Sequence, residues 1–511
     1  MDESDYTYEE LNNSILFCRT LVCLSAEGDK LADEVFELIR NELSSGTRGP
    51  RPQCSNEQAT KLLTFNLYVS YLVHEENWLG IGMRHSDYKV SAPSNHFHLS
   101  DRGVRSVVEA LEILGLIERV GGDRYSGLRT RIRALKLLRE IFQRYELTEY
   151  EFYPHAQSKF IVLKSPKPDA VEIDFEMTPE LEEIQAVLKD YNQLLRNTFI
   201  DIPSRDRSYV ERRNGIKVPI THTKKHVYRV FNNGRFDQGG RFYGPWWQQV
   251  GRKYRSKIYI NNKPTVEIDY SGMHIAILYG KHNLRCPKKP YEVEAPDFVD
   301  KWNIKHCYKL LILLAVNSTD FSTTADAFRF GSHPLSDERS YTNSQIKEMI
   351  DMFISAHPII ESHLFSGYGN TLMNLDSQVC EQVIKHFTNL GIPVLTVHDS
   401  ILIQEEYEKE LNEVMKSALK SVCTADTELR NDTEKQTETI EYEIVDDDLF
   451  QQYLQLEEDP YRAEWAATQT LGDEINHNKK SEGYKRRLRA FVQYINRYNI
   501  NNPLLEEEEE L

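Results

Sequence analysis

The clearest helical pattern along the chain is the recurrence of apolar residues every three to four positions. It predicts helices over residues 61–73 (KLLTFNLYVSYLV) and 101–114, the second ended by Gly115. A third helix, acidic and amphipathic, is expected within 174–199 (DFEMTPELEEIQAVLKDYNQLLRNTF), and residues 1–45 are expected to be helical as well. The apolar face of the second helix consists of Val104, Val107, Val108, Leu111 and Leu114.

Shorter runs rich in β-branched and aromatic residues predict strands. Residues 116–120 (LIERV), the turn GGD and residues 124–135 (RYSGLRTRIRAL) indicate a strand, a loop and a second strand. Farther along, an apolar run ends at Asp269 in PTVEIDYSG, and GIPVLTVHDSILI holds Asp399 between two strand-like runs. The latter pattern predicts a hairpin with the acid at or near its turn.

Turn-forming and charged segments divide the chain into parts. The linker SSGTRGPRPQ follows an N-terminal helical segment, and no internal repeat is present. The parts are the N-terminal segment at 1–50, a domain at 55–148, a helical and basic connecting or thumb-like region at 149–235, a core at 236–440, and an acidic C-terminal helical region with a disordered tail at 441–511.

The overall charge hides two opposite local biases. The 511-residue chain carries a formal net charge of −17, with acidic residues gathered near its end in segments such as EYEIVDDDL and EEEEEL. Residues 205–257 are instead rich in Arg and Lys, with aromatic residues between them. Cations that neutralise phosphates, interleaved with rings on which bases stack, favour a nucleic-acid surface. A basic face over core aromatics explains the same pattern equally well.

Cysteine use and hydropathy argue against other classes. The seven cysteines are scattered without a C-x-x-C pair, so we expect reduced core residues rather than disulfides or a zinc site. No apolar run approaches the ~20 residues that cross a bilayer, and the acidic start MDESDYTYEE is unlike a secretory signal. A cytoplasmic protein without a membrane partner is the expectation.

The candidate catalytic residues are two carboxylates, Asp269 and Asp399, together with Lys309. Each aspartate lies in an apolar, strand-forming run, where an isolated carboxylate costs several kcal/mol unless a cation compensates it. Two carboxylates on adjacent strands can share a pair of Mg²⁺ ions, or Mn²⁺ in their place, which activate an attacking hydroxyl and stabilise a leaving pyrophosphate. Between them, KHCYKLLILLAVNS puts Lys305 and Lys309 on one helical face, where they can bind the phosphates of a nucleotide.

The order of helix, strand, glycine-rich loop and strand at 101–135 resembles a winged helix-turn-helix domain. The resemblance implies that its arginines face a nucleic-acid backbone. Winged helices also dock proteins, so a structural role stays open. The arginines concerned are Arg102, Arg105, Arg124, Arg129, Arg131 and Arg133.

The order of motifs over about residues 200–410 resembles the palm and fingers of family A DNA polymerases and bacteriophage-type single-subunit RNA polymerases. DQGGR is similar to the family's T/DxxGR motif, which implies that Arg241 contacts the nucleic-acid backbone. EIDYSG resembles motif A, which implies that Asp269 binds both metals and that the carbonyl of Tyr270 is a further ligand.

Two more motifs complete the resemblance. KHCYKLLILLAVNS resembles motif B, which implies that Lys309, with Lys305, acts on the triphosphate. TVHDS resembles motif C, which implies that Asp399 is the second metal ligand and that His398 lies by the primer terminus.

Several positions depart from the family pattern. The motif B helix ends in Asn317 and Ser318 instead of an aromatic residue and Gly. His274, a candidate nucleotide-binding residue, stands where the family's DNA polymerases carry a Glu that crowds the 2′ position. The Asp of DxxGR is typical of the RNA polymerases and DYS of the DNA polymerases, so the sugar of the nucleotide stays open. The short interval between the two motif aspartates implies reduced fingers.

The sequence therefore predicts an α+β fold, a right-hand polymerase palm with an antiparallel sheet and helical fingers, preceded by a winged-helix-like domain and a helical N-terminal segment. The expected activity is template-directed nucleotide transfer from nucleoside triphosphates on a DNA template or primer-template, in replication of a mobile element or phage. The alternative is a DNA-binding replication initiator or regulator with a degenerate palm. A His-Asp metal phosphohydrolase is disfavoured by the strand-forming flanks of His398, and a reverse transcriptase by the lack of a motif A before IVDDDL.

Overall fold

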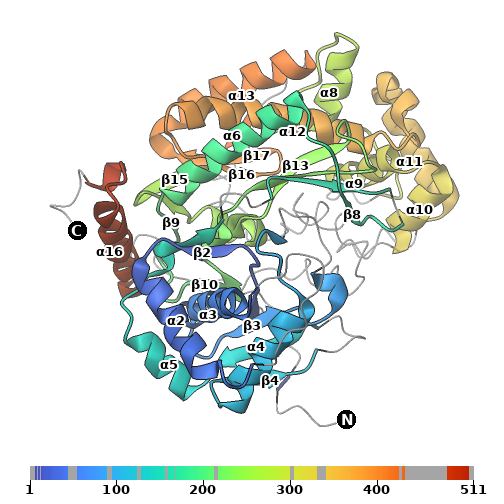
Figure 1. The fold of residues 1–511 in the computed structure, drawn as a ribbon. Coiled ribbons are helices and arrows are strands. Elements are labelled where there is room, and N and C mark those ends of the chain that lie inside the picture. The colour runs from blue at the N-terminus through green and yellow to red at the C-terminus, as the bar shows by residue number, and fades with distance from the viewer. Residues whose placement is uncertain are drawn as a thin grey trace.

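Two hydrophobic cores organise the computed structural model of the chain. One core is built from residues between 15 and 152 and the other from residues between 160 and 423. We call the two parts the N-terminal lobe, blue in Figure 1, and the large lobe, green to orange. The structure describes residues 6–7, 10–11, 13–43, 55–88, 95–122, 128–155, 159–166, 168–211, 217–299, 304–330, 341–424, 429–431 and 480–505.

The N-terminal lobe combines short strands with longer helices. The strands are β1 Ser14–Leu16, β2 Leu21–Cys23, β3 Trp78–Ile81, β4 Ile117–Val120, β5 Thr130–Ala134 and β6 Phe152–Pro154. The helices are α2 Ala26–Ile39, α3 Asn56–Val73, α4 Asp101–Ile113 and α5 Lys136–Gln143. β3 pairs antiparallel with β5, which pairs antiparallel with β4, while β1 runs parallel to β3. The pairing of β4 with β5 confirms the two predicted strands, whereas residues 123–127, between them, lie outside the described residues.

Helix α4 has the apolar face that its sequence predicts. Ser100 caps its start by accepting a hydrogen bond from Gly103 N at 3.1 Å, and Gly115 follows its end with φ +64°. Leu114 differs from the prediction because it lies just beyond the helix and is 37% exposed. The fully buried positions of the face are Val104, Val107, Val108 and Leu111.

Residues 1–45 are not helical throughout, which corrects the prediction. Strands β1 and β2 occupy 14–16 and 21–23, and α2 is the long helix of this segment. Strands of three residues are too short to show an alternating pattern, and they form because β3 and β6 supply hydrogen-bonding edges far away in the sequence.

The arginines of the β4–β5 region do not all face solvent. Arg131 is 4% exposed and donates from Nε to Leu11 O at 2.5 Å, so the prediction that it faces a nucleic-acid backbone is wrong. The physical reason is Gly80, its cross-strand partner on β3, where a Cβ would meet Arg131 Nη1 at 2.9 Å. The missing side chain lets the guanidinium fold over the sheet. Arg105 on α4 is exposed, and residues 123–127, with Arg124, lie outside the described residues.

The large lobe contains two larger sheets covered by helices and, among its described residues, a two-stranded sheet as well. Its first sheet has the order β13-β12-β7-β8 and its second the order β16-β17-β15-β14-β9, with β18 also paired to β15. The strands are β7 Ile161–Lys164, β8 Glu172–Ile173, β9 Ile200–Asp201, β12 Tyr228–Phe231, β13 Gly239–Tyr243, β14 Tyr259–Ile260, β15 Lys263–Tyr270, β16 Leu395–Val397, β17 Ser400–Gln404 and β18 Leu429–Asn431.

Helices of the large lobe fall into two groups in Figure 1. One group lies over the sheets and consists of α6 Pro179–Arg196, α8 Met273–Lys281, α12 Gly369–Asn389 and α13 Glu408–Cys423. The other gathers at one end and consists of α9 Ile304–Asn317, α10 Phe321–Phe330 and α11 Asn343–Ala356. Within the described residues, no helix combines the length and apolarity needed to cross a bilayer.

The region at 149–235 is not the helical segment that the sequence predicts. Among the described residues of this region only α6 is a long helix, and it confirms the predicted acidic helix. The rest supplies strands, and β12 pairs antiparallel with β13 across the expected boundary at 235/236. Since β7 runs parallel to β12, α6 lies in the long crossover that parallel strands require.

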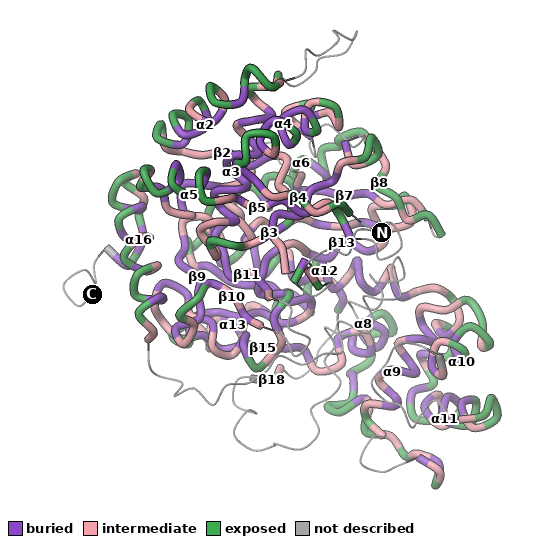
Figure 2. Tube along the Cα trace, turned by 90° about the horizontal axis from the view of Figure 1, so that it is seen from below, coloured by how far each residue is buried: buried purple, intermediate pink, exposed green. Residues whose placement is uncertain are grey.

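Part of the basic and aromatic segment at 205–257 lies inside the large lobe. Its cations Arg229, Arg241 and Arg255 are 1%, 4% and 3% exposed, and Trp246 and Trp247 are fully buried. Figure 2 shows buried strands inside the molecule, whereas α2 and α16 present an exposed face. Neither alternative predicted these buried cations, each of which is paired with a carboxylate from elsewhere in the chain. The core position of the two tryptophans does agree with the alternative of a basic face over core aromatics.

Helix α16, Glu482–Arg497, contacts both lobes (Figure 1). Its apolar face packs on Tyr150 and Phe199, and Arg487 Nε donates to Asp201 Oδ2 at 2.7 Å. Beside this contact lie the half-buried Glu149 and the buried Lys225. The acidic segment before α16, residues 432–479, and the terminal tail lie outside the described residues.

Glu149 predicts a pH dependence of stability. Burial raises its pKa from 4.5 to about 7, although its carboxylate accepts a hydrogen bond from His222 N at 2.7 Å. A carboxyl that holds its proton more tightly when folded loses stability as the pH rises through the interval between the two pKa values. We expect the advantage of Glu149→Gln over the wild type to grow by about 3 kcal/mol between pH 4.5 and 7.

Urea denaturation at several pH values measures this difference. Burial lowers the pKa of Lys225 to about 7, so its contribution to the pH dependence of stability lies above pH 7. The change between pH 4.5 and 7 can therefore be assigned to Glu149. Glu146→Gln, at a neighbouring exposed position, is the matched control. Parallel stability curves for the wild type and Glu149→Gln would contradict the prediction.

Candidate active site

Asp269 and Asp399 lie at the ends of neighbouring strands. Strand β15 pairs antiparallel with β17 in a register that sets Asp269 opposite Ser400, the residue that follows Asp399. Asp269 is 6% exposed and Asp399 is half-buried. Asp399 therefore lies one residue from the position directly across the strand pair from Asp269.

The hairpin predicted at 392–403 is confirmed. β16 and β17 pair antiparallel, with Val397 opposite Ser400, so His398 and Asp399 form a two-residue turn. His398 has φ +57°, a left-handed conformation that tight hairpin turns require. Its ring packs edge-on against Tyr243 of β13 at 6.0 Å between centroids. The turn fixes Asp399 at the tip of a buried hairpin.

A buried ion pair at β15, hydrogen-bonded by the first residue of β17, lies behind the turn. Glu267 of β15 binds Arg255 with a closest distance of 3.0 Å, and both side chains are about 3% exposed or less. Ser400 Oγ donates to Glu267 Oε1 at 2.8 Å. Burial alone would raise the pKa of Glu267, but Arg255 and Ser400 outweigh it and the pKa lies below its ordinary value. The first residue of β17 is thereby tied to β15.

Ser400→Ala tests this tie. We expect the free energy of unfolding to fall by about 1.5–3 kcal/mol, because the hydroxyl donates to a charged, buried acceptor. Urea denaturation measures the change. Ser421→Ala, which removes an exposed hydroxyl bonded to Gln382 Oε1 at 2.7 Å, should change stability by no more than about 0.5 kcal/mol. Equal effects of the two substitutions would contradict the assigned role of Ser400.

A second buried cluster joins three segments beside the aspartates. Arg241 of β13 is bound by Asp376 of α12, with Nε 3.1 and 3.0 Å from the two carboxylate oxygens. His274 of α8 places Nε2 at 2.9 Å from Asp376 Oδ2 and 3.2 Å from Arg241 Nη2. The cluster links the DQGGR segment, the helix after β15 and α12.

The charges of this cluster reach the candidate metal ligands. Burial alone would raise the pKa of Asp376, but Arg241 and His274 hold it below its ordinary value. The pKa of Arg241 is raised, since Asp376 and then Asp399 outweigh the effect of burial. Burial also raises the pKa of Tyr270, and the charges of Asp399 and Asp269 add to that shift. The guanidinium therefore lies in the field of both acidic sites.

Helix α12 is the functional element that the sequence analysis missed. Besides Asp376, its Ser377 and Glu381 bind Arg229 of β12 at 2.8 and 2.6 Å, and Asn374 donates to Gly239 O at 3.2 Å. Four polar residues on one helical face of a segment that also supplies core residues are the one signal that could have indicated it.

The predicted phosphate-binding lysines lie on α9. Lys305 is exposed and Lys309 is half-buried, and they occupy one face as predicted. α9 packs against α10, α11 and α12, and Asn317 at its end donates to Leu313 O at 2.8 Å. A Cβ on Gly369 would meet Asn317 Oδ1, so this departure from the family pattern fits closely against the start of α12.

The oxygen donors at the strand ends fit Mg²⁺ better than a metal that is bound by protein ligands alone. Among the described residues no group of three or more His, Cys, Asp and Glu side chains could hold an ion. Two carboxylates, Asp269 and Asp399, with the carbonyl of Tyr270 nearby, match the requirement of Mg²⁺ for one or two carboxylates plus substrate phosphates.

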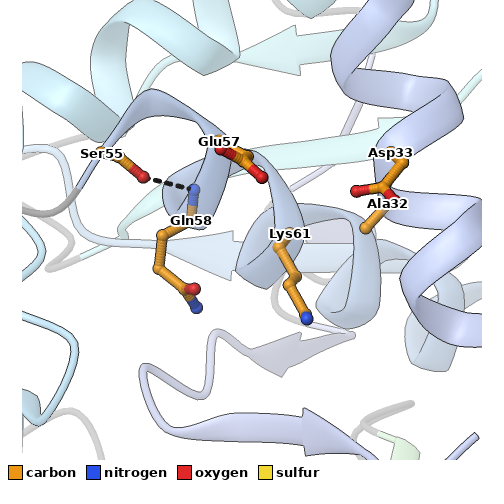
Figure 3. Close-up of a pocket in the computed structure, with 6 residues that line it drawn as sticks. All are labelled: Ala32, Asp33, Ser55, Glu57, Gln58 and Lys61. Carbon is orange, nitrogen blue, oxygen red and sulfur yellow. Dashed lines mark hydrogen bonds between the residues drawn. The ribbon is translucent and has the colours of Figure 1, made fainter. Parts of the chain in front are cut away.

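A separate shallow cavity lies on the N-terminal lobe (Figure 3). It measures about 190 Å³ and lies between α2 and α3, where Ser55 Oγ accepts from Gln58 N at 3.0 Å and Lys61 extends past the helix. Lys61 is ion-paired with Asp29, so its charge is compensated. The cavity shares no residue with the strand ends.

No family model and no curated protein matches the chain. Solved structures give distant similarity. The polymerase domain of Pol1 from M. smegmatis, in complex with DNA primer-template and dNTP, matches with a TM-score of 0.26 at 10% sequence identity, over 82% of this chain and 67% of that chain. At this TM-score the similarity carries no argument about fold or function.

Proposed function

We propose that the chain is a template-directed nucleotidyltransferase in which Asp269 and Asp399 hold two divalent ions. The observation that supports this most is the register of β15 with β17, which makes the two aspartates neighbours at the strand ends. Two carboxylates so close together repel each other when both are ionised, and divalent ions shared between them relieve that repulsion. A pair of metal ions is the ligand that this chemistry favours.

Each residue then has a role in phosphoryl transfer. Asp269, Asp399 and the carbonyl of Tyr270 would hold the ions, which when bound activate the attacking hydroxyl and neutralise the leaving pyrophosphate. Lys305 and Lys309 bind the triphosphate as point charges. The β16–β17 turn keeps Asp399 fixed, so that little reorganisation is needed during reaction.

The flanking residues orient the nucleic acid and the nucleotide. We assign His398 to the primer terminus, and we give Arg241, which is 4% exposed and bound to Asp376, a supporting role behind the site rather than a contact with the strand backbone. His274 contacts the nucleotide side of the site and is held by Asp376. In the N-terminal lobe the winged-helix-like α4 presents Arg102 and Arg105 to DNA.

Extension of a labelled primer tests the proposal. Purified protein is incubated with primer-template, Mg²⁺ and either deoxynucleoside or ribonucleoside triphosphates, and products are resolved by length. Template-dependent extension with one or both sugars is the expected result and identifies the substrate. Absence of extension and of de novo synthesis with either sugar, by protein that still binds DNA, would overturn the proposal and favour a replication initiator.

A further inference from the structure

A cleft separates the N-terminal lobe from a hairpin of the large lobe. The hairpin consists of β10 Tyr209–Glu211 and β11 Lys217–Pro219, paired antiparallel. The cleft measures about 200 Å³ and is open to solvent. Drug-sized ligands occupy about 300–1,000 Å³, so this space accepts a single planar ring system. Trp78 and Arg133 line one side, and Tyr209 and Lys217 the other.

The wall on the N-terminal lobe is flat and rigid. The guanidinium of Arg133 lies 4.5 Å from the ring centroid of Trp78 and 5.1 Å from that of Tyr6. Arg133 is also held by Glu118 at 2.7 Å and by the hydroxyl of Tyr6 at 2.7 Å. Its charge is therefore compensated, and its plane is fixed on an indole in the manner of the stacking surfaces that receive unpaired bases.

The wall on the hairpin is aromatic and positively charged. Lys217 Nζ lies 5.0 Å from the ring centroid of Tyr209, and Arg207 Nη1 donates to the Tyr209 hydroxyl at 3.2 Å. Among the described residues neither Arg207 nor Lys217 forms an ion pair, in contrast with the buried cations of the same segment. The hairpin is tied to the opposite lobe by Lys217 N, which donates to Asn13 Oδ1 at 2.6 Å.

The acids in the cleft are already engaged. Glu10 accepts from the backbone and the hydroxyl of Thr7 at 2.8 and 2.9 Å, and Glu76 faces Arg139 at 3.5 Å. Burial, together with the charges of Arg207 and Lys217, lowers the pKa of His74 below its ordinary value. Its Nδ1 accepts from Glu76 N at 3.2 Å, so the proton lies on Nε2 and can be donated. The side chains of the cleft that are left to bind a ligand are therefore aromatic, polar or cationic.

We propose that this cleft binds one unpaired base of a single-stranded nucleic acid, stacked between Arg133 and Tyr209, with Arg207 and Lys217 on the adjoining phosphates. Cations along a backbone combined with rings that stack on bases are the features of single-strand binding sites. Neither feature involves a 2′-hydroxyl, so single-stranded DNA and RNA are both ligands. The site does not depend on Asp269 or Asp399, and its ligand can be tested without catalysis.

Fluorescence anisotropy with a fluorescein-labelled single-stranded oligonucleotide tests the site in the full chain. Tyr209→Ala is expected to weaken binding about tenfold or more, because stacking is worth about 1–3 kcal/mol per base. Lys217→Ala is expected to lower the slope of log K against log salt concentration by about 0.7, the value for one contact with a single strand. Tyr209→Phe, which keeps the ring, should bind within about twofold of the wild type.

Two control variants distinguish the cleft from the rest of the basic segment and from the strand ends. Lys253→Ala removes an exposed cation of the same basic segment outside the cleft and should leave the affinity unchanged. Asp399→Asn should also bind the single strand like the wild type, so failure of the nucleotidyltransferase proposal would leave this result intact. Unchanged affinity and salt slope in both Tyr209→Ala and Lys217→Ala would overturn the inference, as would equal losses for the duplex of the same sequence.

Discussion

Replacing Asp399 with Asn is expected to reduce nucleotide incorporation by about 10³-fold while the protein stays folded. A metal held by this carboxylate stabilises several kcal/mol of transition-state charge, and each ~1.4 kcal/mol is a factor of ten in rate. Asn keeps the shape of Asp in the two-residue turn, so the hairpin of β16 and β17 should form as before.

Single-turnover primer extension with Mg²⁺, together with thermal melting by circular dichroism, measures both parts. Glu405→Gln neutralises an exposed carboxylate just after β17 and is the matched control, expected to keep full activity. If Asp399→Asn retains more than about a tenth of wild-type incorporation, the carboxylate does not hold a catalytic ion.

Replacing Asp376 with Ala is expected to lower the free energy of unfolding by about 3–5 kcal/mol and to abolish incorporation as well. Asp376 and Arg241 are 3% and 4% exposed, so truncation leaves a buried guanidinium without its counter-ion. His274 loses the same partner, and the contact between α8 and α12 loosens with it. Urea denaturation and primer extension below the transition measure the two effects.

A double replacement separates stability from function in this cluster. Asp376→Leu combined with Arg241→Met removes both charges and fills a similar volume, which is often neutral or stabilising in protein interiors. The double variant should regain most of the stability that Asp376→Ala loses, without regaining incorporation. Recovery of activity together with stability would mean that the cluster is only structural.

The local sequence pattern was sufficient to predict the strand and the hairpin that carry the two aspartates. β-branched and aromatic residues on both sides of Asp269 and Asp399 predict the strand and the hairpin, and both are present with the acids at their ends. Antiparallel pairing of these two segments was a hypothesis from chemistry, because two lone carboxylates in apolar runs require a common partner. The register in which the two segments pair could be read only from the structure.

Sequence could not show which cations are buried. Arg241 and Arg229 have the surroundings of a nucleic-acid patch in the sequence, but their partners on α12 lie 135 and 152 residues away. A charged side chain can be buried when tertiary contact brings an opposite charge next to it, and the local sequence pattern does not contain that information. Arg131 was misjudged for the related reason that the space above Gly80 exists only after β3 and β5 pair.

Short strands were the second feature that could not be predicted from the sequence. β1 and β2 have three residues each, and β9 and β14 have two, so they are too short to show an alternation of apolar and polar residues. Such strands owe their conformation to the edge they pair with, which is why the N-terminal segment and the region at 149–235 were expected to be helical. Long, strongly patterned helices such as α4 and α6 were predicted correctly because their apolar faces are complete within one segment.

The parallel pairing of β7 with β12 determines where the chain can be cut. A fragment that starts at residue 236 would lack both β12 and β7 and would leave β13 as an unpaired edge, which favours aggregation. It would also lack Phe199, on which α16 packs. A shortened protein that keeps the strand ends intact must therefore begin before Phe160 and retain residues 480–505, and recombination between relatives would be tolerated best between β6 and β7.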